Sequence, residues 1–375
     1  MHKRIYTFRL SPTSHQRTLM ENTLEVCRCV YNTTLCVRKT AWEEKKESIS
    51  KFDTYNLLPE WKKENPEFTS VYSQVLQETQ ERVDFAFRHF FRRVKTGQTP
   101  GYPRFKGKGW YDSFTYPQYG GGVKLRESGL FLSKIGIIPV VLHRKISPLA
   151  SIKRVTIKKK AGEWYASLFL HFSIFPICRN SKQKGIVGVD LGCRTFATLS
   201  DGSKIDNPKF TGTAGGKIAK AQRRLSRSET GTKKRTKARR ALLKVWQKVD
   251  NQKTNFLHQE SRKLVNRYNA LVFEDLDVSE MVKKSKWKSL TKSILDSNWG
   301  QFVSLCSYKA ENAGGKVIKV NPRNTTKTCS RCGALVEKTL NDRIHSCPFC
   351  LLKMDRDLNA AINILRLGQK SLASA

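Results

Sequence analysis

The sequence has no long apolar segment and few acidic residues. Its 375 residues include 31 aspartates and glutamates against 70 lysines and arginines, a formal net charge of +39. No apolar run approaches the roughly 20 residues that a membrane-spanning helix needs. The first residues, MHKRIYTFRLSP, alternate as a strand does and lack the apolar core of a signal peptide. We therefore expect a cytoplasmic protein with no membrane partner.

The chain also lacks the evenly spread cysteines of a secreted protein held together by disulfides. Four of its ten cysteines form two tight pairs near the C-terminus, and the other six lie in apolar or mixed surroundings. This distribution favours a reducing compartment and one metal site over a disulfide framework.

The excess of positive charge implies a polyanionic partner. A compact chain with so much charge of one sign is destabilised by self-repulsion, which a bound polyanion relieves. With 39% apolar and 10% aromatic residues the chain can bury a core, which argues against a disordered polycation. Nucleic acid is the commonest such partner, and a membrane surface is the rival.

Periodicity divides the first half of the chain into a β-rich and a helical part. Residues 3–9 alternate as a strand, residues 15–95 follow a helical period, and residues 102–178 alternate again with glycines between the runs. We expect the last segment to form a small antiparallel β-domain that the N-terminal strand completes.

A new unit begins near Gly185. We expect, in order, a buried strand (GIVGVDLG), a hairpin that turns at Asp201-Gly202, a basic helical hairpin over 217–268, a second buried strand over 270–274, a helix over 297–313, a strand over 316–320 and a final helix over 355–367.

The strongest motif is a pair of cysteine knuckles, formed by Cys329, Cys332, Cys347 and Cys350. Two residues separate the cysteines of each pair, and fourteen lie between the pairs. Each knuckle directs two thiolates toward one tetrahedral ion, so four sulfurs predict a structural zinc with no open position. His345 could compete as a ligand, but four cysteines suffice. Leu351 replaces the usual glycine after the second knuckle, which predicts a less regular turn there.

Three acidic residues lie at the ends of predicted elements. Asp190 and Glu274 each end a buried strand, where an unpaired carboxylate is costly unless it meets a cation. Asp357 opens the final helix, two residues after Asp355. Two residues are about 200° apart on a helix, so one of the two can face the strand ends, and Asp355 serves better as the N-cap. Converging carboxylates hold two magnesium ions for attack on phosphodiesters, although each acid alone could be a cap or turn residue.

Several motifs together resemble the TnpB family, the transposon-encoded ancestors of the type V CRISPR nucleases. They are GVDLG, FEDL, NTTKTCSRCG, CPFC and DRDLNAAINIL, in this order, with GYPRFKGK and SFTYPQ upstream. The resemblance covers nearly the whole chain and maps Asp190, Glu274 and Asp357 onto the RuvC-type acidic triad. The family's third acid lies two residues before NAA, in agreement with the helical spacing.

The resemblance implies a multidomain α/β protein with a RuvC-like nuclease domain of the RNase H fold, an inserted zinc ribbon, and an N-terminal β-barrel-like wedge domain with an inserted helical recognition domain. The implied boundaries are 1–12 and 100–180 for the wedge domain, 13–99 for the recognition domain, 181–324 and 352–375 for the nuclease domain, and 325–351 for the ribbon.

The family is implied to be RNA-guided. A structured RNA from the transposon end supplies the guide, and the protein, in the prokaryotic cytoplasm or nucleoid, cleaves double-stranded DNA beside a short flanking motif with catalytic magnesium or manganese. The alternatives are a nuclease-silent RNA-guided repressor, a transposase with Asp/Glu catalysis, and a non-enzymatic zinc-ribbon protein. All three acids are intact, which disfavours the repressor, and their order differs from the Asp, Asp, Glu usual in transposases.

Two surfaces are expected to contact nucleic acid. In the basic hairpin the candidates are Arg223, Arg224, Arg235, Arg239 and Arg240, joined by the lysines Lys283, Lys284, Lys286, Lys288 and Lys292 along a strand channel. Near the flanking motif they are Tyr72, Gln74, Gln77 and Gln80, which offer groups to base edges or phosphates. For any one of these side chains the alternative is an ordinary solvated face.

Overall fold

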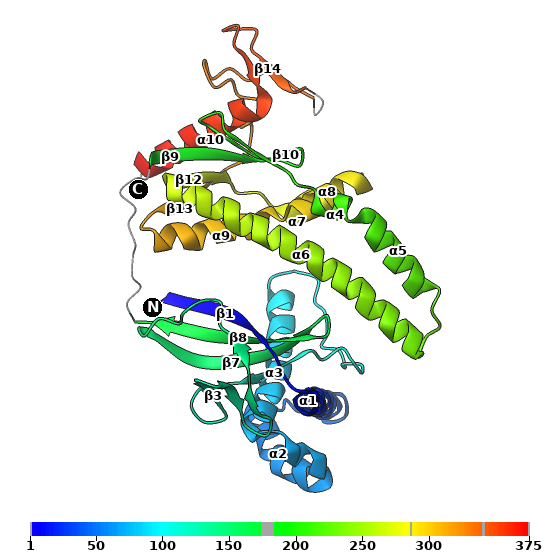
Figure 1. Cartoon of the computed structure of the whole chain (residues 1–375). Coiled ribbons are helices and arrows are strands. Elements are labelled where there is room, and N and C mark those ends of the chain that lie inside the picture. The colour runs from blue at the N-terminus through cyan, green and yellow to red at the C-terminus, as the bar shows by residue number, and fades with distance from the viewer. Residues whose placement is uncertain (1, 174–183, 286, 340–341, 374–375) are drawn as a thin grey trace. The chain divides into compact units, whose positions relative to one another are not determined.

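The computed structural model describes residues 2–173, 184–285, 287–339 and 342–373. It divides the chain into two compact units, Met1–Phe175 and Pro176–Ala375 (Figure 1). Each unit has its own β-sheet and its own helices. No helix in the described part of the chain is long and apolar enough to cross a membrane.

The first unit is built on a five-stranded antiparallel sheet in the order β2-β7-β8-β1-β6. Its strands are β1 (His2–Leu10), β2 (Ser113–Tyr116), β6 (Val140–Val141), β7 (Ala150–Lys160) and β8 (Glu163–Phe172), and β3 (Val123–Arg126), β4 (Gly129–Leu132) and β5 (Gly136–Ile138) form a second sheet. The N-terminal strand pairs with β8 along its whole length, from His2 opposite Phe172 to Leu10 opposite Trp164. The prediction that this strand completes the β-domain is confirmed.

The helices of the first unit lie between β1 and β2 in the sequence, as the helical period of residues 15–95 predicts. They are α1 (Ser14–Thr40), the π-helical turn η1 (Ala41–Lys45), α2 (Lys51–Glu64), the 3-10 turn η2 (Pro66–Ser70) and α3 (Ser73–Lys95). A capping box of Thr13 and Gln16 starts α1. Helices and sheet share one core, because every second side chain of β8, from Trp164 to Phe172, is buried against it.

The second unit contains a five-stranded mixed sheet in the order β11-β10-β9-β12-β13. The strands are β9 (Lys184–Leu191), β10 (Thr195–Leu199), β11 (Lys204–Asp206), β12 (Tyr268–Glu274) and β13 (Lys316–Val320). The first three form an antiparallel meander, whereas β9, β12 and β13 run parallel to one another. Because parallel strands end at the same edge of a sheet, the C-terminal residues of β9 and β12 lie next to each other.

Helices cover both faces of this sheet. The remaining elements are α4 (Phe210–Thr213), α5 (Gly215–Ser226), α6 (Lys233–Arg267), α7 (Val278–Lys284), α8 (Lys288–Ser297), α9 (Trp299–Asn312), α10 (Arg356–Ala373) and the hairpin of β14 (Ile344–Ser346) and β15 (Lys353–Asp355). In Figure 1, α6 and α9 lie on one face of the sheet and α10 lies on the other. Burial alternates accordingly, since Phe273 packs with Phe302 of α9 while Val272 packs with Ile364 of α10.

Helix α10 approaches the sheet closely because two glycines face the contact. A Cβ added to Gly188 of β9 would lie 2.2 Å from the carbonyl oxygen of Ala361, and one added to Gly368 would lie 2.5 Å from a methyl carbon of Val272. Ala360 and Ala361 are fully buried at the contact. The expectation that the small residues of this helix let it press against a sheet is confirmed.

This contact gives a first prediction. Gly188→Ala should lower the free energy of unfolding by about 1–3 kcal/mol, because backbone atoms cannot move aside for the new methyl group. The matched control is Gly185→Ala in the same strand, where an added Cβ meets nothing within 4 Å. We expect the control to be neutral or slightly stabilising. Denaturant unfolding of both variants tests this, and equal stability would contradict the close approach of α10 to β9.

Candidate active site and metal centre

Three acidic side chains meet at the edge of the sheet in the second unit. Asp190 is the next-to-last residue of β9, Glu274 is the last residue of β12, and Asp357 lies in the first turn of α10. Val189 is opposite Phe273 in the parallel pairing. Asp190 and Glu274 are the next residue of each strand, so they lie side by side. The packing of α10 on β9 brings the third acid to the same place.

The surroundings of Asp190 and Glu274 disfavour their ionised forms. Burial raises the pKa of Asp190 to about 8, and the negative charges of Glu274 and Asp357 add to the effect. Burial also raises the pKa of Glu274, although the Thr325 hydroxyl donates a hydrogen bond of 2.5 Å to its carboxylate. A buried cluster of carboxylates is stable in its ionised form when a cation lies among the oxygens. The donor set thus fits a hard divalent ion.

Asp355 has a different role from its neighbour. Its Oδ1 accepts hydrogen bonds from the backbone N–H groups of Asp357 at 2.9 Å and Leu358 at 3.2 Å, and its Oδ2 accepts one from Lys204 at 2.7 Å. The carboxylate is therefore committed to the start of α10 and to an ion pair. The prediction that Asp355 is the cap and Asp357 the acid facing the site is consistent with this geometry.

An arginine partly neutralises the acid cluster. Arg356 Nε lies 3.2 Å from Asp357 Oδ1, and an Nη group of the same guanidinium donates to the backbone oxygen of Asp342 at 2.9 Å. The positive charge of Arg356 opposes the rise in the pKa of Asp190. One cation thus faces the site from the helix that carries Asp357.

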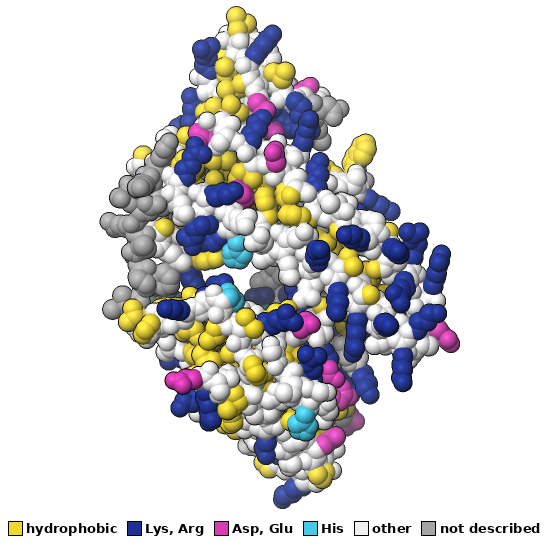
Figure 2. Space-filling view, viewed as in Figure 1, with side chains coloured by type: hydrophobic (Ala, Val, Ile, Leu, Met, Phe, Trp, Pro, Cys, Tyr) yellow, Lys and Arg dark blue, Asp and Glu magenta, His cyan; other side chains and the backbone are white. Residues whose placement is uncertain are grey.

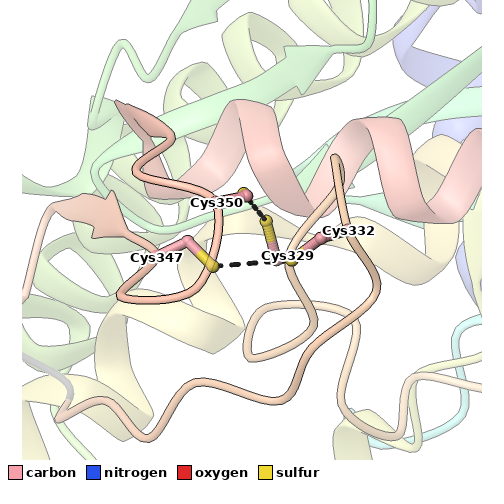
Figure 3. A group of neighbouring side chains, drawn as sticks. All are labelled: Cys329, Cys332, Cys347 and Cys350. Carbon is pink, nitrogen blue, oxygen red and sulfur yellow. Dashed lines mark hydrogen bonds between the residues drawn. The ribbon is translucent and has the colours of Figure 1, made fainter.

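The side chains of the four cysteines lie together in a compact cluster (Figure 3). Their sulfur atoms all lie within 4.8 Å of one another. Among the described residues, no other group of three or more histidines, cysteines and acids has its ligand atoms this close together, and this also holds for Asp190, Glu274 and Asp357. Cys329 and Cys350 Sγ are 3.6 Å apart, as are Cys332 and Cys347 Sγ. Tetrahedral zinc with bonds of about 2.3 Å to sulfur separates its ligands by about 3.8 Å, so the cluster could hold zinc.

Two asparagines of α10 fasten the first knuckle to the acid-bearing helix. Asn359 accepts a hydrogen bond from the backbone N–H of Ser330 at 2.9 Å and donates one to the Thr328 carbonyl at 2.8 Å. Asn363, one turn later, donates to the carbonyls of Thr325 at 2.9 Å and Thr328 at 2.7 Å. Both side chains are buried. Sequence reasoning missed these positioning residues, although asparagines four apart on an apolar helix face were a usable signal.

The turns of the two knuckles are alike, so the prediction of a less regular second turn is wrong. Gly333 donates its N–H to the Cys329 carbonyl and Leu351 donates its own to the Cys347 carbonyl, both at 3.0 Å. Both residues have left-handed backbones, with φ of 81° and 60°. Leucine accepts the regular turn at the cost of an unfavourable backbone conformation.

A second prediction follows for this turn. Leu351→Gly should raise the free energy of unfolding by about 1 kcal/mol, because glycine adopts positive φ without a steric cost. The leucine side chain is 82% exposed, so its loss removes little packing. Gly333→Ala at the equivalent position should have the opposite sign. Thermal unfolding of both variants is the measurement, and a destabilised Leu351→Gly protein would contradict the account.

The basic hairpin forms as expected, and its cations are mostly exposed. Figure 2 shows lysines and arginines gathered over α5 and α6, and Arg223, Arg224 and Arg240 are exposed. Arg235 is half-buried instead, and its guanidinium donates to the backbone oxygens of Leu225 and Ser228, which closes the hairpin. Arg239 is also exposed. Of the channel lysines, Lys283, Lys284, Lys288 and Lys292 are exposed and Lys286 lies outside the described residues.

The candidates on α3 divide in the structure. Gln80 is fully buried and donates a hydrogen bond of 2.6 Å to the Thr54 carbonyl, so the prediction that it contacts nucleic acid is wrong, because α2 covers this face of the helix. Tyr72 is half-buried and stacks on Tyr116, with ring centroids 6.0 Å apart. Gln74, whose amide contacts Gln118, and Gln77 are also half-buried, and these three stay predictions.

Three family models match the chain. The one described as "Probable transposase" covers residues 173–285, "Cas12f1-like, TNB domain" covers 299–364, and "Helix-turn-helix domain" covers 1–47. In the last region the structure has strand β1 and the single long helix α1, which runs into η1. Asp190 and Glu274 lie in the region matched by the first of these models. Asp357 and the four cysteines lie in the region matched by the second.

Two curated relatives match almost the full length of the chain, and a third matches part of it. A Streptomyces pristinaespiralis protein named "Putative RNA-guided DNA endonuclease" is 33% identical, with 98% of this chain and 89% of the relative covered. "Putative RNA-guided DNA endonuclease InsQ" of Escherichia coli K12 is 30% identical, with 98% and 93% covered. "TnpB-like protein L79" of Acanthamoeba polyphaga mimivirus is 27% identical over 64% of this chain and 48% of its own length.

Among solved structures, the Cas12f1–sgRNA–target DNA complex matches with a TM-score of 0.56 at 14% identity, covering 92% of this chain and 81% of that one. This likeness shows that the fold is the multidomain α/β architecture of the Cas12 effectors. The curated relatives of similar length show the class that the motifs predict. The chain belongs to the TnpB family of RNA-guided DNA endonucleases.

Proposed function

We propose that this protein is an RNA-guided endonuclease that hydrolyses phosphodiester bonds of double-stranded DNA at the site of Asp190, Glu274 and Asp357. The observation that carries the proposal is the convergence of these acids from β9, β12 and α10 on one sheet edge. An antiparallel meander continued by two parallel strands, with the acids at the strand ends, is the arrangement expected of a RuvC-like domain of the RNase H fold.

The three carboxylates would hold magnesium or manganese, because hard oxygen ligands select these ions. When bound there, such ions would supply Lewis-acid polarisation of the scissile phosphate and an activated water. Glu274 is oriented for this role by the Thr325 hydroxyl, and Asp357 by the start of α10 that Asp355 caps. Arg356 lies beside Asp357, where its charge can meet a phosphate oxygen.

The four cysteines would hold a structural zinc. A closed shell of four sulfurs leaves no position for a substrate, so this centre does not take part in the chemistry. Asn359 and Asn363 join the first knuckle to α10, and the ribbon thereby helps to fix the helix that carries Asp357. We assign the ribbon to 325–351 and the nuclease domain to 181–324 and 352–375, with a wedge domain over 1–12 and 100–180 and a recognition domain over 13–99.

The positive charge of the chain suits a guide RNA from the transposon end and the target DNA. Lysine and arginine contacts to phosphates carry no sequence information, so pairing with the guide supplies specificity and the protein itself reads a short flanking motif. The cations of α5 and α6 are suited to hold these backbones. With one acid cluster for both strands, cleavage proceeds strand by strand, and nicked DNA precedes the linear product.

A third prediction tests the acids. Asp190→Asn, Glu274→Gln and Asp357→Asn should each lower the rate of guided DNA cleavage by more than about 100-fold. Each variant loses an ionised metal ligand, which weakens metal binding more than the loss of a residue that only orients a ligand. RNA binding should be unchanged. The measurement is a time course of cleavage with the RNA-loaded protein in magnesium.

Asp355→Asn is the matched control for these variants. Asparagine caps helices about as well as aspartate, so this variant should keep its cleavage rate within about tenfold of the unaltered protein. An inactive Asp355→Asn protein beside an active Asp357→Asn protein would show that the two acids have been assigned to the wrong roles.

A further inference from the structure

The first unit contains an aromatic cavity that the proposed nuclease chemistry does not use. Its volume is about 270 Å³, and its aromatic lining consists of Trp42, Phe87, Phe90, Phe91 and Tyr102. Phe87 is buried, whereas the side chain of Trp42 is 55% exposed and that of Phe91 is 56% exposed. Soluble proteins rarely leave several large rings partly open to solvent around one hollow without a partner for them.

An unusual backbone feature places the tryptophan. Helix α1 continues into the π-helical turn Ala41–Lys45, which ends at Lys46 with a left-handed φ of 59°. Trp42 lies in this turn, and Glu47, Ser48 and Ile49 line the cavity after it. Turns of π-helix are rare and occur frequently at functional sites. The turn and the residues after it thus place an indole, a carboxylate and a hydroxyl around the cavity.

The opposite wall comes from α3 and the segment that follows it. Tyr102 contacts Phe87 and Phe90 edge-on, with ring centroids 5.7 Å and 5.4 Å apart, and Phe90 contacts Phe91 in the same way at 5.2 Å. Edge-to-face pairs of aromatic rings are favourable, so these contacts stabilise the arrangement of the rings. The wall is therefore a preformed aromatic surface.

The charges around the cavity indicate what kind of molecule fits. Arg38 lines it, but its guanidinium lies 4.6 Å from the Phe87 ring centroid and is paired with Asp84 at 3.2 Å, so the interior offers no unneutralised cation to an anion. Exposed cations lie outside the aromatic lining, on the last two turns of α3, where Arg92 and Lys95 are exposed. A neutral aromatic ring with phosphates beside it matches this distribution. A second copy of this chain does not, because two chains of charge +39 repel each other.

We propose that this cavity binds one unpaired nucleobase of a single-stranded nucleic acid, which stacks on Trp42 and Phe91 while its flanking phosphates meet Arg92 and Lys95. Every base has a face that can stack, and Glu47 and Ser48 offer polar groups to its edge. This inference rests on the proposed function in one respect, which is that the partner of the protein is a nucleic acid. The base can come from the RNA or from a displaced DNA strand, and the experiment distinguishes the two.

The test uses the full-length protein freed of RNA, in EDTA, with short single-stranded RNA and DNA oligonucleotides. Each oligonucleotide is compared with an abasic version that has the same sugar-phosphate backbone and carries no bases. Trp42→Ala and Phe91→Ala should each weaken binding at least about fivefold, since stacking on an aromatic side chain contributes about 1–3 kcal/mol per base. The slope of log Kd against log salt should stay unchanged, because no phosphate contact is lost. The abasic oligonucleotide should bind both variants as it binds the unaltered protein.

Two controls separate stacking from a structural effect. Trp42→Phe should recover most of the affinity. Phe52→Ala removes a phenylalanine of α2 in the same unit that is 64% exposed and does not line the cavity, and it should bind normally. Thermal unfolding checks that all variants fold, which is expected because Trp42 and Phe91 are more than half exposed. Whichever nucleic acid shows the base-dependent loss is the source of the base.

Three results would overturn the inference. They are unchanged binding by Trp42→Ala and Phe91→Ala, an abasic oligonucleotide that binds as well as the complete one, and a dimer of the RNA-free protein in sedimentation velocity that Trp42→Ala dissociates. Because the assay contains no divalent cation and no guided target, its outcome is independent of cleavage. If the protein cuts guided DNA but shows no base-dependent binding here, only the proposed base site is wrong. If it shows base-dependent binding but does not cut, the base site stands and the proposed nuclease function is wrong.

Discussion

The second unit has to hold three carboxylates near one another in buried surroundings, although like charges repel. The rest of this unit is built around that constraint. Burial raises the pKa of Asp190, and the negative charges of Glu274 and Asp357 raise it further, so the elements that carry these acids hold them together against their repulsion. Parallel pairing of β9 with β12, the missing side chain of Gly188 and the hydrogen bonds of Asn359 all hold the acids in place. A divalent cation bound among the carboxylates would replace this repulsion by attraction.

Much of this site could be predicted because it follows from local patterns. Each strand-end acid comes directly after an apolar run, and the two-residue spacing of Asp355 and Asp357 decides which can cap the helix. Contacts between distant segments could not be predicted in the same way. The burial of Gln80 depends on α2, and the partners of Asn359 are carbonyl and amide groups of a knuckle about thirty residues away. Periodicity shows which face of a helix is apolar, and does not show which segment covers it.

The chain assigns different physical tasks to its charged and aromatic residues. Exposed arginines and lysines of α5 and α6 can attract any nucleic acid, an attraction that salt weakens and that does not depend on sequence. Arg235 belongs to the same cationic stretch but holds the hairpin together, so a count of basic residues overstates the binding surface. The rings around Trp42 offer stacking, which salt affects little. The two kinds of contact can therefore be separated by experiment.

The central claim is that base pairing with an RNA directs one acid cluster to its target. The measurement is the position of cleavage by the RNA-loaded protein before and after the guide sequence is replaced, with the protein and the flanking motif unchanged. The account predicts that the cut moves to the DNA that pairs with the new guide, because contacts to phosphates cannot specify sequence. Cleavage at a specific sequence by protein that has been treated with RNase and freed of RNA would contradict it.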